Sequence, residues 1–297
     1  MASWQAGLTS FVLRHWFKPK LARAPDAPAL RRVMNGPTLP PPRGARAAPG
    51  TVGGVAGEWM IAADAVPNVA TLLYLHGGGY FACTPQTHRA ITSSFAIAGF
   101  KTFAPDYRLA PEHPFPAGLD DAIAAYRGLL QDHAPRQIVV AGDSAGGGLS
   151  MALLLSLRDR GIALPAAAVL FSPFVDLAAT GESARTNSSR CAMFTGDAFG
   201  RAAQFYVGEG DRRAPLASPL YADLQSLPPL LIHVGADETL LDDSRRLAER
   251  AQRAGVKVEM KIWPAVPHVW QLFRRWIPEG RASLREAGMF LAREAGQ

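Results

Sequence analysis

The sequence of 297 residues has few cysteines, few lysines and no long apolar run. Its two cysteines, Cys83 and Cys191, are too few for a disulfide framework or a metal cluster built on cysteine. The strongest apolar runs, such as residues 151–157, are far shorter than the about 20 residues that a membrane-spanning helix needs. The N-terminus lacks a secretory apolar core and cleavage site. We therefore expect a cytoplasmic protein with no stable membrane insertion.

The net charge of +6 raises the question of a nucleic-acid partner. Nucleic-acid binding leaves basic residues clustered on one face or helix. Here 26 of the 31 basic residues are arginines, and they are scattered singly or in pairs. We therefore expect no nucleic-acid partner. The histidines lack metal-ligand spacing, and no phosphate-binding loop or dinucleotide fingerprint is present, so we expect no metal and no cofactor.

The order of apolar runs indicates the fold. Hydrophobic residues make up 48% of the chain and charged residues 19%, which excludes disorder and a coiled coil. From about residue 57, short apolar runs alternate with helical patterns, which predicts βαβ units and a mainly parallel sheet. The predicted strands are 71–75, 100–104, 137–141, 167–171, 230–234 and 257–263, and the predicted helices are 87–98, 118–130, 147–160 and 243–254.

Three segments fall outside this alternation. Residues 4–17 have apolar residues at helical spacing with basic residues nearby, which is typical of a helix on a membrane surface or of a lid helix over a pocket. The short run and the modestly basic polar face favour the lid. Residues 37–49 are rich in proline, glycine and alanine and predict a linker. Residues 180–216 are long enough for a second lid segment.

A nucleophile elbow is predicted at Ser144. The strand predicted at 137–141 runs into Gly142-Asp143-Ser144-Ala145-Gly146 and then into a helix, which is the context that G-x-S-x-G requires. A nucleophile on so sharp a turn has strained dihedral angles, and the small residues Gly142 and Gly146 let the chain pass close by. The helix N-terminus adds positive dipole character where an oxyanion would form.

A glycine loop follows the first predicted strand of the sheet. His76-Gly77-Gly78-Gly79-Tyr80 comes directly after residues 71–75. Three consecutive glycines cost backbone entropy, so a plain tight loop explains them poorly. Loops of this kind in lipases and esterases point their amides at a developing negative charge. We expect His76 to hold the loop rather than to act as a base.

A catalytic acid and a histidine should follow the serine in that order. Asp237 follows the strand predicted at 230–234, and His268 follows the strand predicted at 257–263. Both therefore lie at the carboxyl ends of strands, where the ligand crevice of a parallel sheet forms. Asp242 and Asp243 compete as the acid, but they come a turn later, where an N-cap role is sufficient. We predict the triad Ser144, Asp237 and His268.

Taken together, these residues resemble the hormone-sensitive-lipase-like family of α/β-hydrolase esterases, the bacterial family IV, in its GDSAG subgroup. The resemblance spans about residues 57–295 and includes the glycine loop, the block 106–114, the elbow, Asp237 and His268. It implies an α/β-hydrolase fold, a mostly parallel central sheet flanked by helices, with a helical cap. The implied oxyanion donors are the amides of Gly78, Gly79 and Ala145.

The resemblance also implies a domain division. Residues 1–45 would form an N-terminal cap segment and residues 46–297 the catalytic domain, with residues 180–215 inserted as a second cap segment. The chain departs from the family in two places, because Glu238-Thr239 follows Asp237 where Pro-Leu is frequent, and Val269-Trp270 follows His268 where Gly-Phe is frequent. We expect both departures to alter the pocket rather than the mechanism. Relatives pair through the last strand of the sheet, which makes a homodimer an expectation.

The sequence thus predicts a serine carboxylesterase for short- to medium-chain acyl esters. Lactones suit the same triad and remain an alternative, whereas nothing in the sequence identifies a device for an amine leaving group. A ligand receptor on the same fold is the alternative from another class, since fold alone does not fix function. Aromatic residues could wall the substrate pocket, although core packing is an alternative for each. The predicted substrate-binding residues are Tyr80, Phe81, Phe205 and Trp270, with Phe194, Phe199 and Tyr206 as further candidates.

Overall fold

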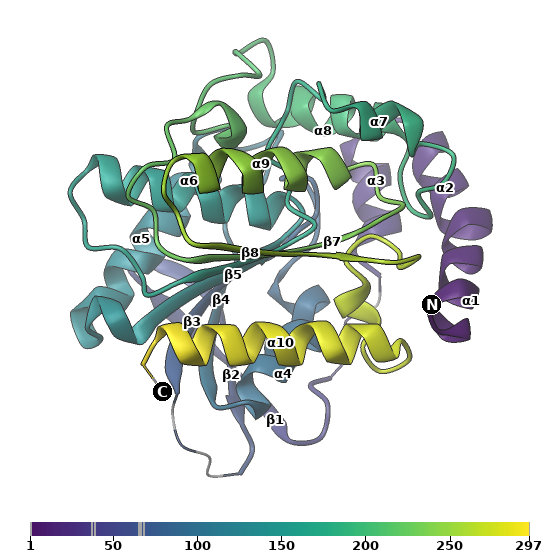
Figure 1. Ribbon diagram of the computed structural model, residues 1–297. Helices are drawn as coiled ribbons and strands as arrows, with labels where there is room; N and C mark the ends of the chain where they lie inside the picture. Colours follow the sequence, from purple (N-terminus) through teal and green to yellow (C-terminus); the bar gives the residue numbers. More distant parts are fainter. Residues whose placement is uncertain (1, 37, 39, 65–66, 68, 297) are drawn as a thin grey trace.

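A single eight-stranded sheet forms the centre of the molecule (Figure 1). The computed structural model describes residues 2–36, 38, 40–64, 67 and 69–296. The strand order is β1-β2-β4-β3-β5-β6-β7-β8; β1 and β2 pair antiparallel, β2 joins β4 antiparallel, and the other pairs are parallel. The strands are β1 (Ala45–Val52), β2 (Val55–Ala62), β3 (Ala70–Leu75), β4 (Phe100–Pro105), β5 (Ile138–Asp143), β6 (Ala168–Phe171), β7 (Leu230–Gly235) and β8 (Val258–Trp263).

Helices cover both faces of the sheet. On one face lie α4 (Arg89–Ile97) and α10 (Pro278–Glu294), and on the other lie α5 (Ala117–Asp132), α6 (Ala145–Asp159) and α9 (Leu241–Arg253) (Figure 1). Short 3₁₀ turns connect these elements. They are η2 (Pro85–His88), η3 (Pro135–Gln137), η4 (Pro219–Tyr221) and η5 (Trp270–Phe273). The α/β-hydrolase fold predicted from the sequence is confirmed.

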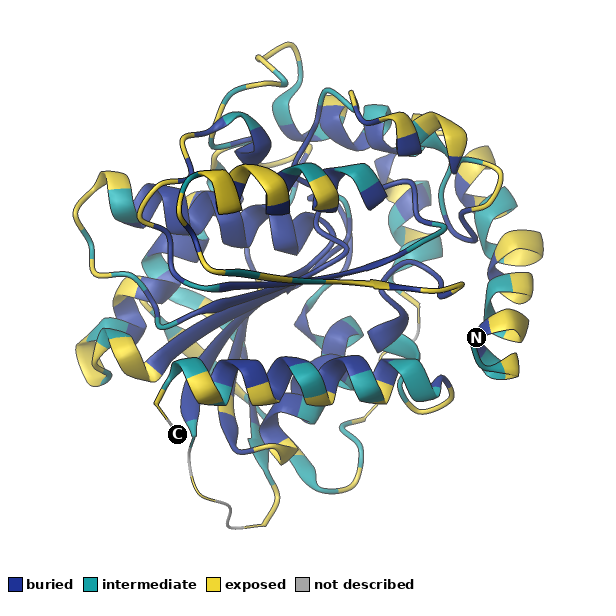
Figure 2. Cartoon of the chain, in the orientation of Figure 1, coloured by how far each residue is buried: buried dark blue, intermediate teal, exposed yellow. Residues whose placement is uncertain are grey.

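Strand β3 shows why the predicted strands read as continuous apolar runs. Its side chains alternate between two cores: Leu72 and Tyr74 face the core under α4 and α10, and Leu73 and Leu75 face the core under α5 and α6. A parallel strand buried on both faces needs apolar residues at every position. Figure 2 shows this pattern as dark blue strands between helices whose outer sides are exposed.

The N-terminal helices lie beside residues 180–215 at the same end of the molecule (Figure 1). We call residues 180–215 the second inserted segment. The N-terminal helices are α1 (Trp4–Val12), the π-helical turn η1 (Leu13–Phe17), α2 (Lys18–Arg23) and α3 (Ala27–Met34). The second inserted segment contains α7 (Glu182–Thr186) and α8 (Gly196–Val207). None of the helices in the described residues combines the length and the apolarity needed to cross a bilayer.

The structure corrects one predicted boundary and adds elements. Residues 45–49 were predicted to belong to a linker, but they form the start of β1, which is held by pairing with β2. The hairpin β1–β2 and helix α10 are absent from the sequence prediction. They extend the sheet at one edge and cover one of its faces.

Candidate active site

The turn between β5 and α6 places Ser144 at its tip. Ser144 has φ 52° and ψ −121°, a conformation that is unfavourable for a residue with a Cβ atom. Hydrogen bonds hold it there: the Ser144 amide donates to the Phe171 carbonyl at 2.8 Å, and the Ser144 carbonyl accepts from the Phe174 amide at 2.9 Å. A Cβ atom on Gly142 would lie 2.3 Å from the Gly146 carbonyl oxygen, so this turn requires glycine there.

The glycine loop after β3 lies against the same turn. Gly78 and Gly79 have φ values of 121° and 64°, and both line one cavity together with Ser144. The Gly78 carbonyl accepts hydrogen bonds from the amides of Phe81 and Ala82, which closes the loop. Ala145 is the first residue of α6, so its amide has no intrahelical acceptor. The glycine loop and the first turn of α6 therefore both lie beside Ser144.

Asp143 joins the glycine loop to the nucleophile turn. Its Oδ1 accepts hydrogen bonds from the Tyr74 hydroxyl at 2.5 Å and the Gly77 amide at 3.0 Å, and its Oδ2 lies 3.3 Å from His88 Nε2. Burial alone would raise the pKa of Asp143, but His88 and the Tyr74 hydrogen bond outweigh burial and lower it. A buried carboxylate thus fixes the position of the glycine loop relative to Ser144.

His76 at the start of the loop is a packed residue. Its ring stacks on Tyr107 with a centroid distance of 4.3 Å, and its Nδ1 lies 2.8 Å from the Gly77 carbonyl oxygen. Burial, and next the neighbouring His88, lower the pKa of His76 to about 3. It is therefore neutral near pH 7.

The acid that contacts His268 is Glu238, not Asp237. His268 Nδ1 lies 2.5 Å from Glu238 Oε2. The Glu238 side chain is fully enclosed, and its Oε1 also accepts hydrogen bonds from the Gly235 amide and the Ser172 hydroxyl. The prediction that Asp237 orients the histidine is therefore wrong in this structure.

Asp237 instead faces away from the histidine. Its carboxylate forms an ion pair with Arg190, and its side chain is 29% exposed. The turn after β7 determines which of the two acids points inward. The Glu238 amide donates to the Gly235 carbonyl, so Glu238 folds back toward the end of the strand. Of the two consecutive acids, only the second is directed inward. The competitors Asp242 and Asp243 bond to backbone amides of residues 175, 176 and 183.

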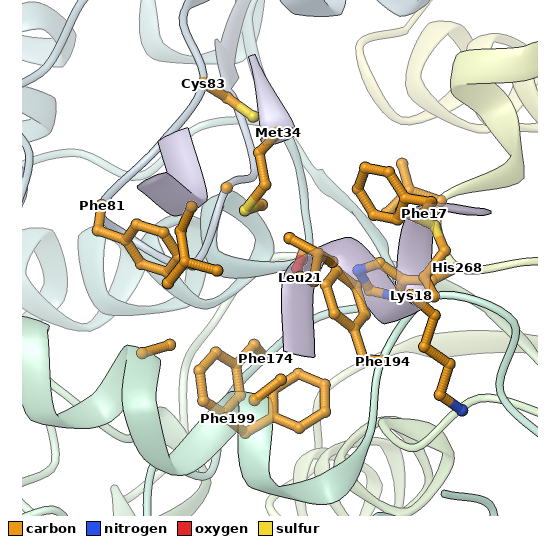
Figure 3. Close-up of a pocket in the computed structure, with 18 of the residues that line it drawn as sticks. Phe17, Lys18, Leu21, Met34, Phe81, Cys83, Phe174, Phe194, Phe199 and His268 are labelled. Atoms are coloured by element: carbon orange, nitrogen blue, oxygen red, sulfur yellow. The ribbon is translucent and has the colours of Figure 1, made fainter. Parts of the chain in front are cut away.

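A cavity of about 410 Å³ contains Ser144 and His268 (Figure 3). Gly78, Gly79 and Asp143 also line it, so it brings the predicted nucleophile, base and glycine loop together. The N-terminal helices and the segment around α8 form much of its wall. The wall is mostly apolar and includes Phe17, Leu21, Leu30, Met34, Phe81, Phe174, Met193, Phe194, Phe199 and Leu272.

The predicted substrate-binding aromatics divide into two groups. Phe81 lines the cavity, whereas Tyr80, Phe205 and Trp270 do not appear among its lining residues. Tyr80 packs in the core, where it stacks on Tyr206 at 3.8 Å. The Phe205 ring packs against the Phe81 ring at a centroid distance of 5.2 Å, and Trp270 is fully buried against Trp263. The structure therefore does not place these three residues in the wall of this cavity: Tyr80 and Trp270 are core residues, and Phe205 is half-buried.

The lining aromatic closest to the histidine comes from the second inserted segment. The Phe194 ring lies 5.1 Å from the His268 ring in an edge-to-face arrangement. Val269, the residue after His268, also lines the cavity and has φ 48°, which is rare for a β-branched residue. Cys83 lines it too, and burial raises the pKa of its thiol to about 12, so the thiol is neutral.

Polar contacts join the N-terminal helices to the second inserted segment. Lys18 Nζ donates to the carbonyls of Ser188 at 2.5 Å and Cys191 at 2.8 Å, and Arg14 donates to the Arg190 carbonyl at 2.7 Å. Burial lowers the pKa of Lys18. We call these three contacts the lid latch.

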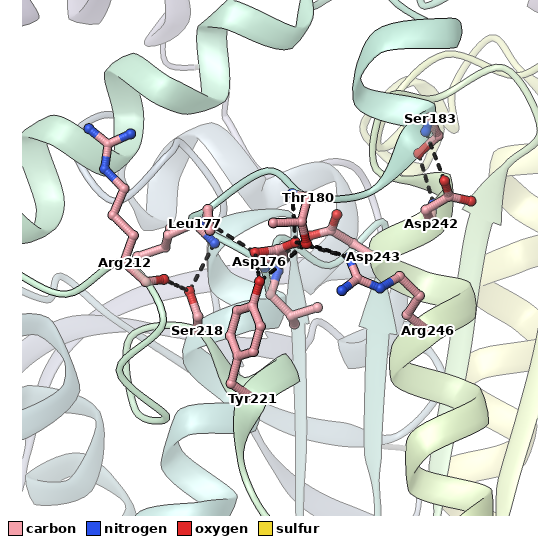
Figure 4. Close-up of polar contacts among 12 residues, drawn as sticks. Asp176, Leu177, Thr180, Ser183, Arg212, Ser218, Tyr221, Asp242, Asp243 and Arg246 are labelled. Atoms are coloured by element: carbon pink, nitrogen blue, oxygen red, sulfur yellow. Dashed lines mark hydrogen bonds and ion pairs between the residues drawn. The ribbon is translucent and has the colours of Figure 1, made fainter.

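A buried carboxylate fixes the base of the second segment (Figure 4). Asp176 accepts hydrogen bonds from the Thr180 amide and hydroxyl and from the Tyr221 hydroxyl, and it pairs with Arg246 of α9 at 3.0 Å. The Ser183 amide donates to the Asp242 carboxylate, and the Asp242 amide donates to the Ser183 hydroxyl. The segment that carries Phe194 is therefore tied to the helix that begins just after Glu238.

Comparisons with known proteins agree with this fold. A sequence profile described as the alpha/beta hydrolase fold matches residues 72–272. The chain is 45% identical over 249 residues to an acetyl-hydrolase of Streptomyces hygroscopicus, which covers 83% of each chain. It is 36% identical over 243 residues to an esterase of Acinetobacter venetianus, which covers 80% of this chain and 78% of that protein. A crystal structure of an esterase from the bacterial hormone-sensitive lipase family superposes with a TM-score of 0.91 at 42% identity, over 99% of both chains.

Proposed function

This chain belongs to the alpha/beta hydrolase fold family, among its hormone-sensitive-lipase-type esterases, and we propose that it hydrolyses short- to medium-chain acyl esters through an acyl-enzyme on Ser144. The observation that carries the proposal is the cavity that contains Ser144 and His268, with the histidine hydrogen-bonded to the buried Glu238. A serine, a histidine and an orienting carboxylate are the groups that acyl transfer by a triad requires.

In the proposed mechanism His268 removes the proton of Ser144 as the hydroxyl attacks the ester carbonyl. His268 Nε2 has no hydrogen-bond partner among the described residues, which leaves it free to accept that proton. Glu238 fixes the tautomer with the proton on Nδ1 and stabilises the imidazolium that forms. His268 then protonates the leaving alcohol, and water attacks the acyl-enzyme by the reverse steps.

We propose the amides of Gly78, Gly79 and Ala145 as donors to the oxyanion. The positive φ values of the two glycines and the helix N-terminus at Ala145 support this role. Donors of this kind are fixed before the reaction begins, and removing one donor from such a site typically costs about a hundred- to a thousandfold in rate.

The size and chemistry of the cavity support small apolar acyl groups. A volume of about 410 Å³ lies near the lower end of the range for small-molecule sites, roughly 300–1,000 Å³. We propose that Phe81, Phe174 and Phe199 contact the acyl or alcohol chain. We also propose that residues 1–45 and 180–215 act as a two-part cap, since both contribute to the cavity wall.

A graded series of p-nitrophenyl esters, from acetate to palmitate, tests the proposal. We expect turnover to be highest at short to medium chain length and to vanish in Ser144→Ala. The control is Ser156→Ala, which should retain activity. Ser156 is buried near the C-terminal end of α6, whereas the elbow precedes the N-terminal end of that helix. If the wild type hydrolyses lactones but no ester, the lactonase alternative replaces this proposal. Ligand affinity without any turnover would favour the receptor alternative.

We further propose a homodimer that forms through β8. This strand ends the sheet, and three of its residues, Glu259, Lys261 and Ile262, are exposed. An edge strand presents unpaired backbone groups that a second strand can bind. Light scattering after size-exclusion chromatography measures the mass directly. A location in the reducing cytoplasm is proposed from the two cysteines, which are free and buried.

A further inference from the structure

The N-terminal helices expose an apolar face to solvent. Trp4 is 66% exposed, Phe11 50% and Trp16 58%, and Leu8 and Val12 lie exposed between them. Trp276, 48% exposed, extends this face, because its ring meets the edge of Trp4 at a centroid distance of 5.2 Å. We call these six residues the aromatic patch. Figure 2 shows the outer side of α1 as exposed along its length.

The patch is held in place. The Ser3 amide and hydroxyl donate to Glu279 at 2.6 and 2.8 Å, which fixes the start of α1 to α10. The lid latch fixes its other end at Arg14 and Lys18. On the inner side, Ala6 packs against Trp263 and Trp270, and Leu13 packs against Met193. The apolar side chains therefore face water on an ordered helix.

Several exposed aromatic residues gathered on one face mark an interaction surface rather than scattered surface apolarity. Tryptophan in particular is enriched where protein meets the headgroup layer of a bilayer. An amphipathic helix of this kind can lie in that layer without crossing it.

The charges around the patch favour a partner with an anionic surface. Residues 1–25 contain Arg14, Lys18, Lys20 and Arg23, whereas the nearby acids are Asp26 and the Glu279 bound to Ser3. Arg275 is exposed directly beside Trp276. Such a basic rim is complementary to anionic lipid headgroups. A second copy of the chain docked patch to patch would bring the same cations face to face, which disfavours self-association here.

The patch also continues into the wall of the active-site cavity. Trp16 belongs to the patch, and the next residues, Phe17 and Lys18, line the cavity that contains Ser144. One helical segment therefore has an outer surface on the patch and an inner surface on the cavity. An ester dissolved in a bilayer touching the patch would lie close to the lid over Ser144.

We propose that the aromatic patch docks the protein on an anionic lipid bilayer surface. The helix would then serve both roles that its sequence left open, because it forms part of the lid and lies on a membrane surface. Docking depends on the exposed face alone. Its test is therefore separable from the esterase activity, and either proposal can fail without the other.

Co-sedimentation of the full chain with vesicles tests the docking. The vesicles are phosphatidylglycerol with phosphatidylcholine, compared with phosphatidylcholine alone, at low and at high salt. We expect the wild type to bind the anionic vesicles at least tenfold more tightly and to dissociate as salt rises. Binding should shift the emission of Trp4, Trp16 and Trp276 to shorter wavelength, as these exposed rings leave water.

Two double variants separate the apolar from the ionic part. Leu8→Gln with Phe11→Gln should weaken binding more than tenfold, since each buried apolar side chain contributes substantially. Lys20→Gln with Arg23→Gln should weaken it by roughly 25-fold, at about fivefold for each cation. Met289→Gln, an exposed residue on α10, is the matched control and should bind as the wild type does. Hydrolysis of dissolved p-nitrophenyl acetate should be unchanged in all three variants.

Two outcomes would overturn the proposal. One is a wild type that stays in the supernatant with anionic vesicles. The other is a patch variant that binds these vesicles like the wild type. Such a variant could also change the chain from dimer to monomer in sedimentation velocity. That result would assign the patch to a second copy of the chain.

Discussion

At the scale of single residues, the contact between Glu238 and His268 makes Glu238 the acid of the proposed triad. Glu238→Gln keeps the shape of the side chain but removes the charge that faces His268 Nδ1. We expect kcat for p-nitrophenyl butyrate to fall by about a hundred- to ten-thousandfold, because the tautomer and the imidazolium lose their partner. Steady-state kinetics at pH 7.5 measure the loss.

Asp237→Asn is the matched control for that experiment. Asp237 pairs with Arg190 at the surface and does not contact the histidine, so kcat should change less than about threefold, in line with the small worth of an exposed ion pair. A large loss in Asp237→Asn together with a nearly normal Glu238→Gln would reverse the assignment and restore the acid predicted from the sequence.

Asp143 carries the second prediction at this scale. Asp143→Ala leaves the Tyr74 hydroxyl and the Gly77 amide without their buried acceptor. We expect the free energy of unfolding to fall by about 3 kcal/mol. We also expect kcat to fall tenfold or more, since the glycine loop loses its fixed position. Urea denaturation and kinetics measure the two effects.

Asp143→Asn keeps an oxygen that can accept both of those hydrogen bonds, so it should retain most of the stability and activity. If Asp143→Ala were as active as the wild type, the glycine loop would not depend on this carboxylate.

The sequence predicts some of these residues and misses others for a physical reason. Ser144 and His268 follow from a motif and from the ends of predicted strands, and the structure brings both to one cavity. Asp237 and Glu238 are consecutive, so the strand end is equally compatible with either. The hydrogen bond from the Glu238 amide to Gly235 decides which one points inward. A sequence does not display that turn.

At the scale of elements, the lid latch joins the N-terminal helices to the second inserted segment. Lys18→Met keeps the length of the side chain but removes the donor to the Ser188 and Cys191 carbonyls. We expect faster amide hydrogen exchange in residues 186–195 and a KM that rises several-fold with little change in kcat, because the wall of the cavity loosens. Exchange mass spectrometry and ester kinetics check both.

Lys20→Met is the matched control, since Lys20 is exposed and lies two residues from Lys18 in the same helix. The latch would be without effect on the cavity if Lys18→Met and Lys20→Met gave the same exchange rates and the same KM.

The sequence predicts strands that are buried on both faces of the sheet better than it predicts strands at the edge of the sheet. The inner strands are continuous apolar runs because both faces are covered. Strand β1 contains proline, glycine and alanine and is only partly buried, so its composition resembles a linker, and pairing with β2 makes it a strand. Helix α10 does carry a detectable signal, since Leu284, Ala287 and Leu291 have helical spacing and are buried.

At the scale of the whole molecule, buried titratable groups predict how stability depends on pH. Burial lowers the pKa of His76 and His233 to about 3. Between about pH 3 and 6.5 the unfolded chain therefore binds more protons at these two sites. The free energy of unfolding should fall as pH decreases below about 6.5, by about 1.4 kcal/mol per unit for each histidine.

Asp243 acts in the opposite direction. Burial, and next the neighbouring Asp176, raise the pKa of Asp243 to about 8, so the folded chain holds a proton that the unfolded chain releases near pH 4. Its contribution to stability is lost as pH rises to about 8. Below pH 6.5 the two histidines change the free energy of unfolding more steeply than Asp243 does. Above pH 6.5 only Asp243, among these three groups, changes it. We therefore expect maximal stability near pH 6.5.

Urea denaturation from pH 4 to 9 measures this curve. Asp243→Asn should fold and should lose the decline above pH 6.5, because the amide does not titrate. A wild-type free energy of unfolding that kept rising between pH 6.5 and 8 would contradict the assignment.

The contact between Ser3 and Glu279 has a consequence for the order of synthesis. The two residues lie 276 positions apart, so the ribosome makes the partner of the first helix about 14 to 55 s after the helix itself, at roughly 5–20 residues per second. Ala6 lacks Trp263 and Trp270 for most of that interval, and Leu13 lacks Met193 for the first part of it. The first helix is thus made well before Glu279 and cannot dock on α10 until Glu279 has been made. Over that interval the growing chain carries a basic helix whose apolar residues are unprotected.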